Sequence, residues 1–93
     1  MEEERTPKDD WWDRFQKLLD DQNEWPTDYI FKFIAPATRV DELKAVFGQV
    51  ELSVRESRKG KYQSVTAVMN MHSSDEVLAI YHAVGRIDGV IAL

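Results

Sequence analysis

The chain has 93 residues, of which 43% are hydrophobic, and a net charge of −5. This length suits a single domain with a two-layer core. No apolar run approaches the roughly 20 residues that a membrane-spanning helix needs. The absence of cysteine excludes disulfides, thiolate metal sites and a cysteine nucleophile. The acidic start, Met1 to Glu4, is unlike a signal peptide, so we expect a cytoplasmic protein with no membrane partner.

The negative charge is concentrated at the N-terminal end. Residues 1–28 hold ten acidic and four basic side chains, whereas residues 29–93 hold seven acidic and eight basic ones. Neutralising phosphates requires clustered Lys and Arg, and this overall acidity argues against a nucleic-acid partner.

A helical repeat of apolar residues runs through residues 9–21, with Trp11, Phe15, Leu18 and Leu19 on one face and Trp12 beside them. So short a helix is marginal alone, and its apolar face must pack on something. It either docks on its own domain, or it uses Trp11, Trp12 and Phe15 as anchors that bind a partner protein.

Trp25-Pro26 ends this helix and begins an extended segment. Residues 29–35 are apolar at nearly every position, which predicts a central strand covered on both faces. Two-residue alternation places Tyr29, Phe31 and Phe33 on one face. It places Ile30, Lys32 and Ile34 on the other.

The remaining elements follow at regular intervals. Thr38 is the expected N-cap of a helix that ends at Gly48. Residues 50–71 predict two strands joined by a basic turn at 57–61. Residues 72–76 predict the capped start of a helix that ends at Gly85, and residues 90–93 predict a last short strand.

The order strand, helix, strand, strand, helix, strand predicts an α+β, ferredoxin-like βαββαβ domain over residues 25–93. Both helices then cover one face of a four-stranded antiparallel sheet. Residues 1–24 form an acidic extension with the amphipathic helix. We expect this helix to cover the second face of the sheet, with the sheet of a second copy in a homodimer as the alternative.

Three segments carry a resemblance to a known family: Trp25-Pro26-Thr27 with Tyr29 and Phe31-Lys32-Phe33, then residues 57–65, then residues 85–88. Over about residues 24–93 the chain resembles the YbeD-like proteins, small bacterial proteins of unknown function with an ACT-like, ferredoxin-type fold. The resemblance implies a fold similar to amino-acid-sensing regulatory domains and no established reaction. The Trp-rich N-terminal helix departs from the family pattern.

Two groups of residues are candidate binding sites. Arg55, Arg58, Lys59 and Lys61 surround Gly60, whose backbone could help to hold an anionic ligand or an acidic partner. Alternatively, they form a solvated hairpin tip that protects the edge strand. Lys32, Ser64 and Thr66 form a polar patch on the open sheet face, or a hydrogen-bonded spot beneath the N-terminal helix.

The sequence shows no nucleophile beside a base, no phosphate-binding glycine loop and no metal-ligand spacing around His72 or His82. We therefore predict no enzyme activity, no cofactor and no metal. The leading hypothesis is a nonenzymatic regulatory or adaptor module that binds a partner protein or a small metabolite.

The alternative is a single-stranded RNA-binding domain of the same fold, since Lys59-Gly60-Lys61-Tyr62 resembles the third-strand motif of such domains. Against it, Lys61 stands at an aromatic position of that motif, and Ser64 stands where a second ring is typical.

Overall fold

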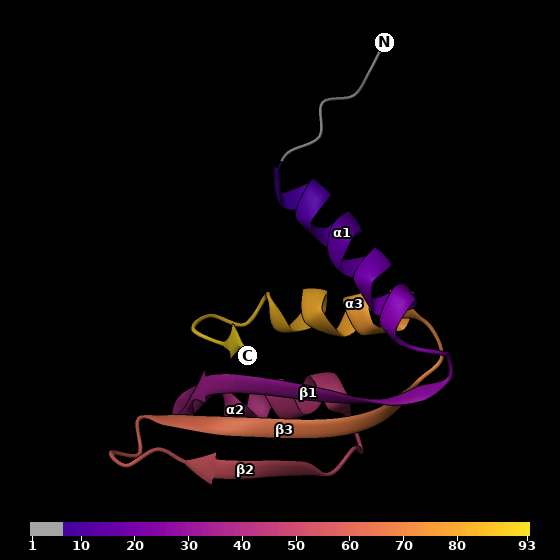
Figure 1. Ribbon diagram of the computed structural model, residues 1–93. Coiled ribbons are helices and arrows are strands. Elements are labelled where there is room, and N and C mark those ends of the chain that lie inside the picture. Colours follow the sequence, from indigo (N-terminus) through magenta and orange to yellow (C-terminus); the bar gives the residue numbers. More distant parts are fainter. Residues whose placement is uncertain (1–6) are drawn as a thin grey trace.

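The computed structural model describes residues 7–93, with side chains from Trp11 onward. Its elements are α1 (Pro7–Gln22), β1 (Thr27–Pro36), the 3-10 helix η1 (Ala37–Arg39), α2 (Val40–Phe47), β2 (Leu52–Glu56), β3 (Tyr62–Met71), α3 (Ser74–Val84) and β4 (Ile91–Ala92). The strands form one antiparallel sheet in the order β2-β3-β1-β4 (Figure 1). The predicted ferredoxin-like fold is confirmed, including its extra N-terminal helix. Within residues 7–93, no helix is long and apolar enough to cross a membrane.

The core forms on one face of the two central strands. Phe31 and Phe33 are fully buried and lie opposite Ala67 and Val65 of β3. Their neighbour Ile30, which points to the other face, is 57% exposed. The prediction of a central strand is therefore right, but the prediction that both its faces are covered is wrong. The buried core comprises Leu19, Phe31, Phe33, Ala35, Val40, Leu43, Phe47, Val65, Ala67, Met71, Val77 and Val84.

The two helices of the ferredoxin-like unit begin in different ways. The capped start predicted for α3 is confirmed, and the cap is Ser73, whose side chain accepts a hydrogen bond from the backbone of Glu76 at 3.2 Å. The predicted cap at Thr38 is wrong. Thr38 lies inside η1, so the α-helix begins only at Val40 and no side-chain cap bond forms there. At the other end of α2, Gly48 adopts a positive φ of 68° and its N–H donates to the carbonyl of Lys44.

The N-terminal helix packs on the helical layer rather than on the open face of the sheet (Figure 1). The ring of Trp12 lies 4.3 Å from that of His82, and Phe15 lies 5.6 Å from Tyr81. The amide of Gln16 also donates to Ser74 Oγ at 3.1 Å. The expectation that this helix covers the sheet is therefore wrong, because its rings find aromatic partners on α3.

Candidate functional site

The open face of the sheet brings the predicted polar patch together. The strand register sets Lys32, Thr66 and Ser53 side by side in one row across three strands. The next row contains Ile34, Ser64 and Arg55. In β1 and β3 these residues alternate with buried ones, and the register places Ser53 and Arg55 of β2 in the same rows, so all of them lie on the face away from the helices.

A shallow hollow of about 440 Å³ lies over these two rows. Two cations, Lys32 and Arg55, and the hydroxyls of Ser53, Ser64 and Thr66 line it, together with Phe33, Val54, Val65 and Leu93. Among the described residues, neither Lys32 nor Arg55 forms an ion pair. The hollow therefore offers two uncompensated positive charges beside three hydroxyl groups.

We call these five polar residues (Lys32, Ser53, Arg55, Ser64 and Thr66) the sheet patch. The sequence reasoning identified Lys32, Ser64 and Thr66 but assigned Arg55 to the hairpin tip and missed Ser53. The alternation of Ser53 and Arg55 with Leu52 and Val54 was the available signal. It puts both residues on the face that the helices leave open.

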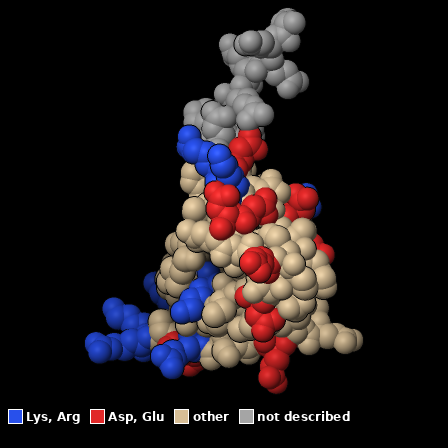
Figure 2. Space-filling model, turned by 45° about the vertical axis from the view of Figure 1, so that its right-hand side comes forward, with Lys and Arg blue, Asp and Glu red and all other residues tan. Residues whose placement is uncertain are grey.

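The predicted hairpin tip is exposed at Arg58, Lys59, Gly60 and Lys61. Gly60 adopts a φ of 74°, and its N–H donates to the carbonyl of Ser57 at 3.1 Å. This amide is thus engaged in the turn, and the expectation that it is exposed to a ligand is wrong. Figure 2 shows Lys and Arg gathered at the lower left, the hairpin end of the sheet, and most Asp and Glu elsewhere.

Tyr62 connects the tip to the sheet patch. It lines one small hollow with Arg55 and Ser64, and a second one with Arg58, Lys59 and Lys61. Tyr62 therefore borders both the sheet patch and the basic tip, with Glu56 also lining the hollow next to Arg55.

The described open face carries few rings. Tyr29, Phe31 and Phe33 point to the helices, and Tyr62 lies at one end of the open face, opposite Pro36. Ser64 and Thr66 occupy the middle of β3. RNA-recognition domains stack bases on rings at the centre of this face, and this arrangement does not provide such a platform.

The rings of the helical layer form a separate cluster. Phe15 and Trp12 are half-buried against α3, while Trp11 stacks on Phe15 at 5.3 Å and remains 52% exposed. Of the three predicted partner anchors, two thus contact their own domain. Beneath them the hydroxyls of Tyr29 and Tyr81 lie 3.2 Å apart. Burial, and then the hydrogen bond with Tyr29, raises the pKa of Tyr81.

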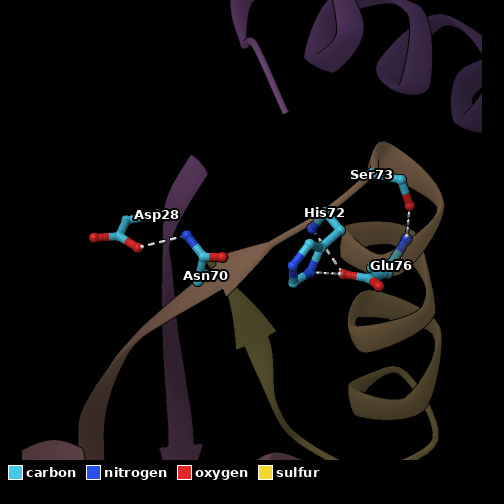
Figure 3. A network of polar contacts seen from close by, with 5 residues as sticks. All are labelled: Asp28, Asn70, His72, Ser73 and Glu76. Atoms are coloured by element: carbon cyan, nitrogen blue, oxygen red, sulfur yellow. Dashed lines mark hydrogen bonds and ion pairs between the residues drawn. The ribbon is translucent and has the colours of Figure 1, made fainter. Parts of the chain in front are cut away.

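Polar contacts at the far end of β3 complete the start of α3 and join β3 to β1 (Figure 3). The backbone of His72 donates to Glu76 Oε1 at 2.8 Å, which completes the capped start of α3, and Asn70 donates to Asp28 at 3.1 Å. Within the described part of the chain, no three His, Asp or Glu side chains are grouped to hold a metal ion.

Comparison with known proteins identifies the family. A model described as "Protein of unknown function (DUF493)" matches residues 20–93. The chain belongs to the DUF493 family. A UPF0250 protein of Shewanella loihica (strain ATCC BAA-1088 / PV-4) is 31% identical over 84 residues, which cover 83% of this chain and 91% of the relative. No solved structure gives a significant match.

The YbeD-like resemblance is thereby confirmed, since YbeD is a protein of the DUF493 family. The DUF493 match includes the whole sheet, and with it the sheet patch and the hairpin tip. It begins inside α1, whose aromatic residues Trp11, Trp12 and Phe15 precede it.

Proposed function

We propose that the chain is a nonenzymatic regulatory or adaptor module that binds an anionic group at the sheet patch. The group is carried either by an acidic segment of a partner protein or by a small metabolite. The observation that supports the proposal is the hollow of about 440 Å³, where Lys32 and Arg55 lie beside three hydroxyls without a neutralising acid among the described residues.

The chemistry of the sheet patch favours carboxylates and phosphates. Hydrogen bonds between charged groups are roughly twice as strong as neutral ones, and a guanidinium can donate two in parallel to one carboxylate. The hydroxyls of Ser53, Ser64 and Thr66 can donate to the remaining oxygens. The basic hairpin tip adds a longer-range attraction that draws an anion toward the same face.

A nonenzymatic role is supported by the surroundings of these hydroxyls. In the part of the chain that the structure describes, none of the three forms a hydrogen bond with a His, Asp or Glu that could act as its base. A hydroxyl without such a base is a weak nucleophile but an ordinary ligand-binding group.

Binding experiments with two kinds of probe test the proposal and distinguish the sources of the anion. One set contains small carboxylate and phosphate metabolites, and the other contains acidic decapeptides, each measured by calorimetry at low salt. We expect a member of one set to bind, and Lys32→Ala combined with Arg55→Ala to weaken it at least tenfold, since a hydrogen bond to a charged group contributes about 1.5–3 kcal/mol.

Lys44→Ala is the matched control, because Lys44 is an exposed cation on α2, in the layer opposite the sheet patch. It should leave affinity unchanged. Binding that survives the double variant, or that is equally strong for uncharged analogues, would contradict the proposal, as would the absence of binding in both sets.

A further inference from the structure

The outer edge of β1 is unpaired over its first half. β4 pairs only with Phe33 and Ile34, and the N–H of Leu93 donates to the carbonyl of Lys32 at 2.9 Å. Backbone groups of every second residue point to the same edge, so those of Ile30 and Asp28 also point outward here. Neither residue forms a backbone hydrogen bond on that edge within residues 7–93. Such an edge can pair with an added strand.

A groove of about 430 Å³ runs beside this edge, on the side of the helices. We call it the aromatic groove, because its lining includes Trp11, Trp12, Phe15, Tyr29 and Tyr81. Aliphatic atoms of Val84, Val90, Ala92 and Leu93 complete it. Side chains that an added strand turned toward the helices would therefore enter an apolar, ring-lined space.

The segment that leads into β1 has a net negative charge. Over residues 11–28 there are five acidic side chains (Asp13, Asp20, Asp21, Glu24 and Asp28) and two basic ones (Arg14 and Lys17). Asp28 is exposed on the open face at the unpaired end of β1, where its one described partner is the neutral amide of Asn70. A strand that ended with a cation opposite Asp28 would complement this charge.

We propose that this edge binds an extended segment of a partner protein as an added antiparallel strand, end to end with β4. The register defines the segment. Residues opposite Phe31 and Tyr29 face the aromatic groove and are apolar, the residue opposite Ile30 is unrestricted, and the residue opposite Asp28 is Lys or Arg. From N- to C-terminus the motif is apolar, any, apolar, basic. Backbone bonds provide the binding and the groove provides the selectivity.

Selection of a displayed library of random decapeptides on the immobilised full-length chain tests this motif. We expect enrichment of the four-residue motif. In the complex, amide hydrogen exchange measured by NMR should slow at Asp28 and Ile30, which the unbound chain leaves exposed.

Backbone N-methylation of the selected peptide provides a matched pair. Methyl groups on the residues opposite Ile30 and Asp28 remove both donors to β1 and should weaken binding at least tenfold, at about 1 kcal/mol for each hydrogen bond. Methyl groups on the residues opposite Phe31 and Tyr29 lie on the far edge of the peptide and should leave affinity within about twofold.

Asp28→Lys should weaken binding about two- to fivefold, as loss of an exposed ion pair does, while Glu51→Lys on the other side of the sheet should not.

Several results would overturn the proposal. One is a selection that yields an acidic consensus or none. Another is an equal loss of affinity with the two methylation patterns, and a third is amide exchange that slows at the sheet patch instead of at Asp28 and Ile30. Sedimentation of the free chain as a dimer, with Asp28 and Ile30 already protected, would show that a second copy occupies the edge.

Discussion

The two faces of β1 differ although the same ten residues form both. Toward the helices, Phe31, Phe33 and Ala35 are completely buried in the core. Toward the open side, Ile30 and Lys32 are exposed, and Ile34 is half-buried. The residues of β1 that face the helices therefore stabilise the fold, whereas those on the open face remain available for binding.

This difference shows that apolar character alone does not identify the core. Ile30 is as apolar as the buried residues, yet it is 57% exposed, and Val68 opposite it is 52% exposed. What separates the two faces is the packing of α2 and α3 on one of them. Substitutions on the face toward the helices should consequently change stability, and substitutions on the open face should change binding.

The largest effect is expected at Phe31. Phe31→Ala should lower the free energy of unfolding by about 3–5 kcal/mol, because it removes a fully buried ring from the core. Ile30→Ala, one residue away on the open face, should lower it by less than about 1 kcal/mol. Urea unfolding followed by circular dichroism measures both. If Phe31→Ala does not fold, Phe31→Leu can be measured in its place. Equal losses of unfolding free energy on the two faces would contradict the prediction.

A second pair compares serines. Ser73→Ala removes the cap of α3 and should cost about 1 kcal/mol, since the N–H of Glu76 loses its acceptor. Ser53→Ala on the open face should change stability by less than about 0.5 kcal/mol. The same urea titrations apply, and a Ser53→Ala loss as large as that of Ser73→Ala would show that the sheet patch is structural.

The smallest effect concerns the tyrosines at high pH. Burial and the hydrogen bond with Tyr29 raise the pKa of Tyr81 above its ordinary value of 10.0, so the folded state keeps this proton after the unfolded state has lost it. The contribution of protonated Tyr81 to the free energy of unfolding is fully present below about pH 10 and declines as the pH rises further.

Thermal melts between about pH 9 and 11.5 should therefore show a steeper loss of Tm for the native chain than for Tyr81→Phe. Tyr62→Phe, at the exposed end of the open face, should retain the native slope. Parallel curves for all three proteins would mean that Tyr81 ionises equally in the folded and unfolded states.

Local sequence rules predicted much of this fold. Alternation in β1 and β3 gave the correct faces for Phe31 and Lys32, and the serine and acidic residues of 72–76 correctly predicted a capped start for α3. The same kind of rule failed at Thr38, because a 3-10 turn follows Pro36 and the α-helix begins at Val40, one residue later than a cap at Thr38 requires.

The position of α1 could not be predicted, because its apolar stripe suits either the open face or the helical layer. The choice depends on residues distant in sequence, such as His82 and Ser74, which contact Trp12 and Gln16 in the folded chain. The aromatic groove was missed for the same reason. It combines α1, α3 and β4, and no local pattern connects them.

The separation of charge also gives the molecule an electric dipole. Acidic side chains outnumber basic ones between Trp11 and Asp28, whereas the hairpin from Arg55 to Lys61 carries four cations and one acid. A chain of net charge −5 should thus be retained at low salt by both anion- and cation-exchange resins. The electrostatic field of an acidic surface should orient the molecule with its hairpin toward that surface. This field acts over about 10 Å at 0.1 M salt.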